Sequence, residues 1–362
     1  AVDLDPGRSE YHTPKALAYL GYSLMKLKRM DESIPRYREA LELSPNLPGG
    51  RSGLAAALLM TGNEAEAISA FAEATRVIVG RVPLHFNHGN LLARAGRPGE
   101  AEDAFLAAIA IDSSHVPTLT NLGALYAEQQ RFDDALEVLS RVRQTSNTSW
   151  KARFNMGLVL GKLKQWDRAI ECLRDLIADH PTSTRARILV GRIMRCAGMY
   201  LEAIEVLDDY SEWGDGEAAA CELLGLVHNE LGNADQAMAF WKEALRVYPA
   251  FVRVHVHMAR AQLSAKEFSD AHLAIQTAID LRPERAGTWT VCGQVELARE
   301  RVDAAIEALE RAIELDATDS EAHYWLGRAH LDKGSMIGAL RQCEQLEAID
   351  STLAARLRAH VY

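Results

Sequence analysis

The chain has 362 residues, of which 48% are hydrophobic and 25% charged, and its formal net charge at pH 7 is −10. A net negative charge disfavours general binding to nucleic acids and to acidic membrane surfaces. The sequence has no apolar run of about 18 residues, the length that a membrane-spanning helix requires. We therefore expect no nucleic-acid partner and no direct insertion into a membrane.

Residues 1–13 precede the first regular element. Within them, Ala1–Pro6 has the same spacing of Ala and Pro as Ala244–Pro249, which ends a later element. We interpret residues 1–13 as a candidate remnant of a preceding element in a longer array. An accidental likeness is the alternative, because the next element begins at Pro14, five residues later than the spacing requires.

From Pro14 onward the sequence repeats with a period of 34 residues. The ten repeats span residues 14–47, 48–81, 82–115, 116–149, 150–183, 184–217, 218–251, 252–285, 286–319 and 320–351. A fixed period of this length is typical of an array of stacked supersecondary units, in which each unit packs mainly on its neighbours.

Two positions of the repeat hold small residues. Column eight is Gly in eight repeats, as at Gly89 and Gly123, and column twenty is Ala in nine, as at Ala101 and Ala135. Gly inside a helix costs roughly 0.5–1 kcal/mol relative to Ala, so its recurrence predicts two helices that cross closely. Larger apolar residues surround these positions at spacings of three and four, which is helical periodicity. Each repeat is therefore predicted to be a helix, a tight turn and a second helix.

The column pattern resembles that of the tetratricopeptide repeat (TPR) family. It consists of Leu-Gly at columns seven and eight, Ala at column twenty, a large apolar residue at column twenty-four and Pro at column thirty-two. The resemblance covers residues 14–351. It implies an all-α fold, a right-handed α-solenoid (superhelix) of stacked antiparallel helix pairs. It also implies that the first helices line a concave groove, with columns two, five, six, nine, twelve and thirteen facing into it. We call these columns the first-helix face.

The chain departs from its own pattern at two places. Repeat six ends in Ser211–Gly216, with two glycines and a tryptophan in place of the usual proline, which predicts a local change of pitch. Residues 352–362 place Leu353, Leu357 and Val361 on one side of a helix, and this predicts a capping helix for the last repeat.

Column six of the first-helix face holds Asn87, Asn121 and Asn155 in three successive repeats. An amide side chain both donates and accepts hydrogen bonds. One such amide per repeat suits the backbone of an extended peptide, and the row resembles the asparagine ladder of a glycosyltransferase superhelix. A further amide, two aromatic side chains and a lysine accompany it: Asn90, Phe86, Phe154 and Lys151. Repeats three to five are therefore predicted to bind a peptide.

The same repeats resemble, in part, the carboxylate clamp of chaperone-binding TPR domains. Asn87, Asn121 and Lys151 are residue types that such clamps use. However, Phe86 stands where the first lysine of a clamp is expected, and Asn155 stands where a basic residue is expected. The sequence thus departs from the clamp at two positions, which puts recognition of a chaperone tail in doubt.

Repeats six to eight place arginines on the first-helix face: Arg185, Arg192, Arg195, Arg253 and Arg260. Guanidinium groups suit carboxylates and phosphates, so these residues predict a partner with acidic segments. Glu222 and Glu230 lie on the same face in repeat seven, and internal ion pairs with the arginines are the alternative interpretation.

The sequence has no G-x-S-x-G, H-E-x-x-H or G-x-G-x-x-G motif. We therefore expect a protein that is not an enzyme, with no catalytic residue, metal site or cofactor. The predicted function is a protein–protein interaction scaffold that binds a peptide segment or partner protein in its concave groove, within a multiprotein assembly. One alternative is the substrate-recruiting region of a larger enzyme such as a glycosyltransferase. Another is an assembly protein of a bacterial export or envelope system.

The five cysteines are odd in number and form no C-x-x-C pair, so we interpret them as apolar filler in a reducing compartment. We expect a cytoplasmic location, with the periplasm as the alternative if a leader has been removed.

Overall fold

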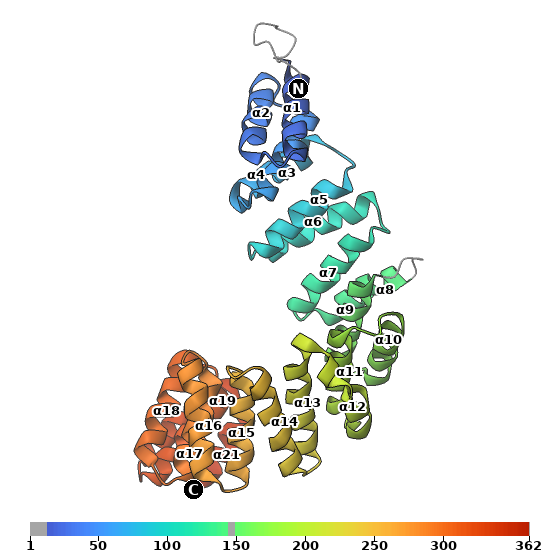
Figure 1. Cartoon of the computed structure of the whole chain (residues 1–362). Helices are drawn as coiled ribbons and strands as arrows, with labels where there is room; N and C mark the ends of the chain where they lie inside the picture. The colour runs from blue at the N-terminus through green and yellow to red at the C-terminus, as the bar shows by residue number, and fades with distance from the viewer. Residues whose placement is uncertain (1–12, 144–148, 362) are drawn as a thin grey trace. The chain divides into compact units, whose positions relative to one another are not determined.

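The structure is a computed structural model that describes residues 13–143 and 149–361. Residues 1–12 of the segment interpreted as a remnant of an earlier element lie outside the described part. Contacts divide the chain into two compact halves, residues 1–181 and 182–362, which we call the N-terminal half and the C-terminal half. Figure 1 shows the helices of both halves in chain order.

The described part of the N-terminal half contains ten α-helices: α1 (Pro14–Lys26), α2 (Met30–Leu43), α3 (Pro48–Met60), α4 (Glu64–Val77), α5 (Val82–Arg94), α6 (Pro98–Ile111), α7 (Val116–Glu128), α8 (Phe132–Arg143), α9 (Trp150–Lys162) and α10 (Trp166–Asp179). The C-terminal half, through residue 361, contains eleven: α11 (Thr184–Cys196), α12 (Tyr200–Leu207), α13 (Glu217–Glu230), α14 (Ala234–Val247), α15 (Val252–Ser264), α16 (Phe268–Leu281), α17 (Ala286–Ala298), α18 (Val302–Leu315), α19 (Ser320–Asp332), α20 (Met336–Ile349) and α21 (Ser351–Val361).

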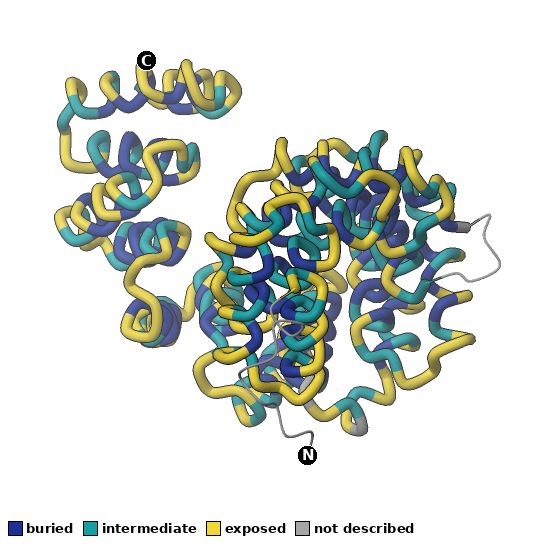
Figure 2. Tube along the Cα trace, turned by 90° about the horizontal axis from the view of Figure 1, so that it is seen from above, coloured by how far each residue is buried: buried dark blue, intermediate teal, exposed yellow. Residues whose placement is uncertain are grey.

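Consecutive helices pack as pairs, and the first helix of each pair is odd-numbered. Each first helix packs on the second helix of its own repeat, and within each half the second helices also contact the next first helix. Buried positions lie where helices face one another, whereas the turns are mostly exposed (Figure 2). The predicted all-α solenoid of helix pairs is confirmed.

The glycines of column eight lie where the two helices of a repeat approach most closely. A Cβ atom added to Gly89 would lie 2.6 Å from Cε1 of Phe105, and one added to Gly225 would lie 2.2 Å from Nε1 of Trp241. Real Cβ atoms do not come this close to other heavy atoms. The large side chain of column twenty-four therefore fills the space that glycine leaves, which explains why the glycine recurs.

All ten first helices end with a residue of positive φ in column fifteen. Five of these residues are glycines, and the others are Lys28, Gln130, Lys164, Lys266 and Glu300. The next residue donates its N–H to a carbonyl five residues back, as Glu267 N does to Gln262 O at 2.8 Å. This is the Schellman ending of a helix, in which glycine is favoured because it has no Cβ atom.

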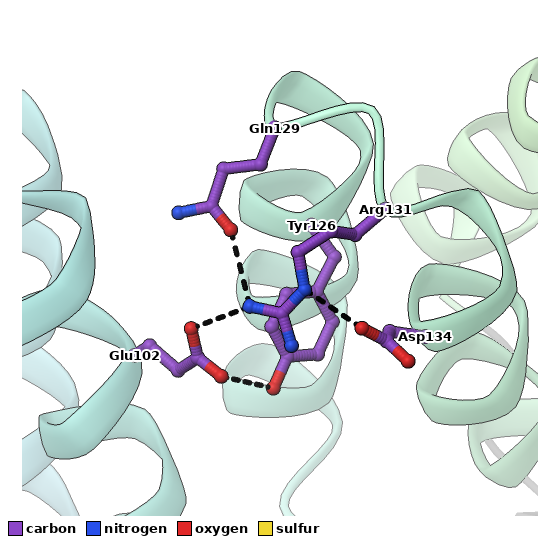
Figure 3. Close-up of polar contacts among 5 residues, drawn as sticks. All are labelled: Glu102, Tyr126, Gln129, Arg131 and Asp134. Atoms are coloured by element: carbon purple, nitrogen blue, oxygen red, sulfur yellow. Dashed lines mark hydrogen bonds and ion pairs between the residues drawn. The ribbon is translucent and has the colours of Figure 1, made fainter.

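A polar network joins repeats three and four (Figure 3). Arg131, just before α8, donates to Glu102 of α6 and to Asp134 of α8, at 2.7 Å in both cases. Its guanidinium lies over the ring of Tyr126, 4.1 Å from the ring centroid. Tyr126 Oη donates to Glu102 at 2.9 Å, and burial together with this bond raises the pKa of Tyr126 to about 12. The phenol therefore stays protonated and holds α7 to the second helix of the preceding repeat.

Two elements depart from the regular repeat. Helix α12 has eight residues and is followed by two short 3₁₀ turns, Tyr210–Glu212 and Gly214–Gly216. The Arg187 guanidinium lies over the ring of Trp213 at 5.7 Å. Helix α21 packs on the last repeat through Leu357, which takes the place next to Gly327 that a column-twenty-four side chain fills in other repeats.

Candidate peptide-binding face

The three column-six asparagines of repeats three to five lie on α5, α7 and α9. Each of these helices has 13 residues and begins at the first residue of its repeat. Asn87, Asn121 and Asn155 therefore occupy the same turn of successive first helices, and all three are half-buried. The structure thus places the row on matching turns within the N-terminal half.

One amide of the row already joins two repeats. Asn121 Nδ2 of α7 donates to Oδ1 of Asn90 on α5, at 2.6 Å. This bond uses one of the two N–H donors of the Asn121 side chain, and Oδ1 of Asn121 takes no part in it. Both residues were predicted from the sequence to lie on the first-helix face, but no sequence pattern predicted that they contact each other.

The aromatic side chains beside the row pack on other rings. Phe86 lies edge-on to the ring of His115 at 5.5 Å and is tilted against Phe105 at 6.4 Å. Phe154 stacks on Trp150 of the same helix, with ring centroids 5.2 Å apart. At the position where a carboxylate clamp has a lysine, Phe86 thus packs on two other rings of repeat three. Lys151 is exposed.

The arginines of the C-terminal half fall into two groups. Arg195 pairs with Glu230, Arg253 Nη2 lies 2.7 Å from Glu222 Oε2, and Arg260 Nη2 lies 3.5 Å from Glu321 Oε2. The remaining two, on α11, are exposed: Arg185 and Arg192. Internal ion pairs thus exist for part of the set, as the alternative interpretation anticipated.

Glu222 is the most buried carboxylate of this face. Its side chain is 8% exposed and is approached by Arg253 and, at 3.4 Å, by Nε2 of His257. A buried carboxylate needs such partners because desolvation strongly disfavours an isolated charge. Arg253 therefore has a structural role in addition to any contact with a ligand.

Two cavities open between neighbouring first helices, and neither was predicted from the sequence. The first, of about 640 Å³, lies between α1 and α3, and the second, of about 390 Å³, lies between α15 and α17. Gly49 lines the first and Gly287 lines the second, and an added Cβ atom at either position would meet nothing within 4 Å. Column two is glycine at these two positions alone, and that is the sequence signal that could have located the cavities.

The second cavity is basic. Arg253, Arg260 and Arg285 line it together with His257. Two of these arginines are the ones paired with Glu222 and Glu321, whereas Arg285 forms no ion pair with any residue that the structure describes. The cavity therefore extends the predicted arginine set by one residue that sequence reasoning had not included.

Histidines on α5 lie close to the asparagine row. Burial lowers the pKa of His85, and burial together with the nearby His85 lowers that of His88. Both rings are therefore mainly neutral near pH 7. In residues 13–143 and 149–361, no three His, Cys, Asp or Glu side chains gather in a way that could hold a metal ion. No helix in these ranges is both long and apolar enough to cross a membrane.

Family models described as TPR or tetratricopeptide repeats match residues 14–47, 86–149, 151–183, 218–251 and 293–334. These matches extend over both halves and agree with the helix pairs of the structure. The chain belongs to the tetratricopeptide repeat family. The fold and the family support a protein-interaction scaffold as the class of protein.

Individual relatives are distant. The human mitochondrial import receptor subunit TOM70 is 24% identical over 135 residues, which is 37% of this chain and 22% of the receptor. The chain therefore matches about a fifth of the length of this relative. A tetratricopeptide repeat protein from Parabacteroides merdae superposes with a TM-score of 0.50 at 15% identity, over 65% of this chain and 93% of that one. YrrB, described as a TPR protein with an unusual peptide-binding site, gives a TM-score of 0.45 at 22% identity, over 56% of this chain and all of that one.

Proposed function

We propose that this protein is a scaffold that binds an extended peptide segment of a partner protein on its first-helix face. The observation that carries the proposal is the row of Asn87, Asn121 and Asn155, placed on the same turn of three successive first helices. The bond from Asn121 to Asn90 supports it, because this bond puts amides of neighbouring repeats within hydrogen-bonding distance of each other.

An extended peptide suits this arrangement for a physical reason. Its backbone offers one donor and one acceptor per residue, and these groups must find partners when the peptide leaves water. Amide side chains supply both kinds of partner, whereas a hydroxyl or a carboxylate is more restricted. The row would therefore hold peptide backbone while the specificity comes from neighbouring pockets.

The C-terminal half favours acidic partner segments. Arg185 and Arg192 are exposed on α11, and Arg285 adds a cation to the cavity between α15 and α17. Because the whole chain has a net charge of −10, these local cations would attract short acidic segments rather than long acidic runs. We propose this surface as a second contact region for the same kind of partner.

The test uses a random peptide library displayed on phage and panned against the full chain. Peptides from the enriched clones are then titrated by fluorescence anisotropy into the wild type and into a triple variant, Asn87→Ala, Asn121→Ala and Asn155→Ala. A neutral hydrogen bond contributes about 1 kcal/mol, so we expect the triple variant to lose at least about tenfold in affinity.

The control is Asn46→Ala, which removes an exposed amide in the turn before α3. This variant should bind as the wild type does. Circular dichroism would establish that all variants keep their helical content. Equal affinity of the triple variant and the wild type for every enriched peptide would rule out the asparagine row as the binding site.

A further inference from the structure

The cavity between α1 and α3 has the composition of a recognition pocket. Tyr19 and Tyr22 of α1 line it and are 73% and 49% exposed. Met25, one turn further along α1, adds a flexible apolar side chain. Exposed aromatic side chains and methionine are enriched in protein interfaces, where they bury a large area when a partner binds. The volume of about 640 Å³ lies in the range of ligand pockets, which is about 300–1,000 Å³.

Glycines shape this cavity. A Cβ atom added to Gly53 would lie 2.3 Å from Cε1 of Tyr37, so the ring of Tyr37 stands directly against the backbone of α3. Gly49, one turn earlier on α3, has no atom within 4 Å of an added Cβ. The first glycine is required by packing, whereas the second leaves space that no side chain of the described residues fills.

The charge of the pocket has one sign. Lys15 and Arg81 line it, and no aspartate or glutamate does. Neither cation forms an ion pair with a residue that the structure describes. A third cation, Lys26, lies over the ring of Tyr22, with Nζ 5.3 Å from the ring centroid. An apolar ligand alone would leave these charges without a partner, whereas a carboxylate beside an apolar group would satisfy both features.

We propose that this pocket binds a partner peptide in which a large apolar or aromatic residue stands next to an acidic one. The proposal rests on the peptide-binding function proposed above and names the chemistry that the N-terminal repeats select. The apolar side chain enters between Tyr19, Tyr22 and Met25, and the neighbouring carboxylate pairs with Lys15 or Arg81. The overall net charge of −10 disfavours a longer acidic run, so one or two carboxylates suffice.

The decisive variant is Gly49→Leu, which fills the pocket from its wall. Because an added Cβ atom at this position would have no atom within 4 Å, the fold should be kept. The matched control is Gly99→Leu. Gly99 also follows a proline at the start of a helix, α6, also has no atom within 4 Å of an added Cβ, and does not line the pocket.

The same phage library is panned against the full-length wild type, Gly49→Leu and Gly99→Leu. We expect a set of clones that Gly99→Leu retains and Gly49→Leu loses, with an affinity decrease of at least tenfold for the synthetic peptides. These peptides should share a large apolar residue next to Asp or Glu. The double variant Lys15→Gln and Arg81→Gln should bind them several-fold more weakly and with a smaller dependence on salt.

Three outcomes would overturn the proposal. The first is that Gly49→Leu loses no clone. The second is that the clones it loses lack an acidic residue next to the apolar one. The third is that the wild type sediments as a dimer and Gly49→Leu as a monomer, which would make a second copy of this chain the occupant. If Gly49→Leu loses no clone while the triple asparagine variant does lose clones, this pocket alone is contradicted and the proposed function stays supported.

Discussion

At the scale of single residues, the left-handed position that ends each first helix is the most regular feature of the chain. A side chain at positive φ brings its Cβ close to the following carbonyl, which costs roughly 1–2 kcal/mol, and glycine avoids that cost. Half of the repeats have a glycine there and half do not. In the other five repeats, a residue with a Cβ atom has a positive φ, which is a strained backbone conformation.

Lys266→Gly is expected to stabilise the protein. Lys266 has φ 63°, and glycine adopts this conformation without the strain of about 1–2 kcal/mol. Glycine also loses more backbone entropy on folding, at a cost of about 0.5–1 kcal/mol, so the free energy of unfolding should rise by a net amount of about 0.5–1 kcal/mol. The neighbouring Ala265 has φ −78°, and Ala265→Gly should lower the free energy of unfolding by a similar amount. Urea denaturation of both variants measures the difference, and effects of the same sign would contradict the explanation.

At the scale of elements, the sequence predicted the helix pairs well because glycine and alanine columns mark where helices cross. All but one of the first helices start at the first residue of their repeat, and α13 starts one residue earlier, at Glu217. The predicted capping helix corresponds to α21, whose Leu357 packs in one cluster with Tyr324, Cys343 and Leu346.

Leu357→Ala should open the C-terminal end of the array. Truncating a buried leucine costs roughly 2–5 kcal/mol, and here the loss would fall on α19, α20 and α21. Cys343 is 1% exposed, and burial raises the pKa of its thiol, so it should react slowly with a thiol reagent in the wild type. We expect Leu357→Ala to speed up labelling of Cys343 by at least tenfold, followed by mass spectrometry of its peptide. Thr352→Ala, an exposed position on the same helix, should leave the labelling rate unchanged.

At the scale of the whole molecule, buried and half-buried histidines in the two halves link stability to pH. Burial is the main cause that lowers the pKa of His85, His88, His228 and His330. The unfolded chain then binds protons more readily than the folded chain, because an unperturbed histidine has a pKa of about 6.5. The stability contributed by the neutral rings is therefore present above about pH 6.5 and is lost as the pH falls through the lower folded values.

His228 offers a direct test of this dependence. Its ring stacks on Phe240, with centroids 5.2 Å apart. We expect the urea midpoint of the wild type to fall between pH 7 and pH 5, and His228→Phe to fall less steeply. His180→Phe, at an exposed position, should keep the slope of the wild type. Parallel slopes for the wild type and His228→Phe would show that His228 does not contribute.

The candidate site was less predictable than the fold, for a physical reason. Columns identify which side chains share a face, and the amides of Asn87, Asn121 and Asn155 were found in this way. Columns do not identify partners on neighbouring helices, so the bond from Asn121 to Asn90 came only from the structure. Ion pairs between Glu222 and the arginines were one of two interpretations of the sequence, and the structure identified Arg253 as the partner. Cavities depend on side chains that are missing as well as present, and they too became visible only in three dimensions.

The short helix α12 shows what keeps the array regular. Its eight residues and the two 3₁₀ turns after it occupy the same stretch of chain that one longer helix and a turn occupy in other repeats. The next helix, α13, still starts within one residue of its expected position. The position at which the next repeat begins is therefore kept by a constant number of residues per repeat and not by a constant helix length. A connection of constant length can thus change its sequence, as at Trp213 under the Arg187 guanidinium, while the next helix still begins within one residue of its expected position.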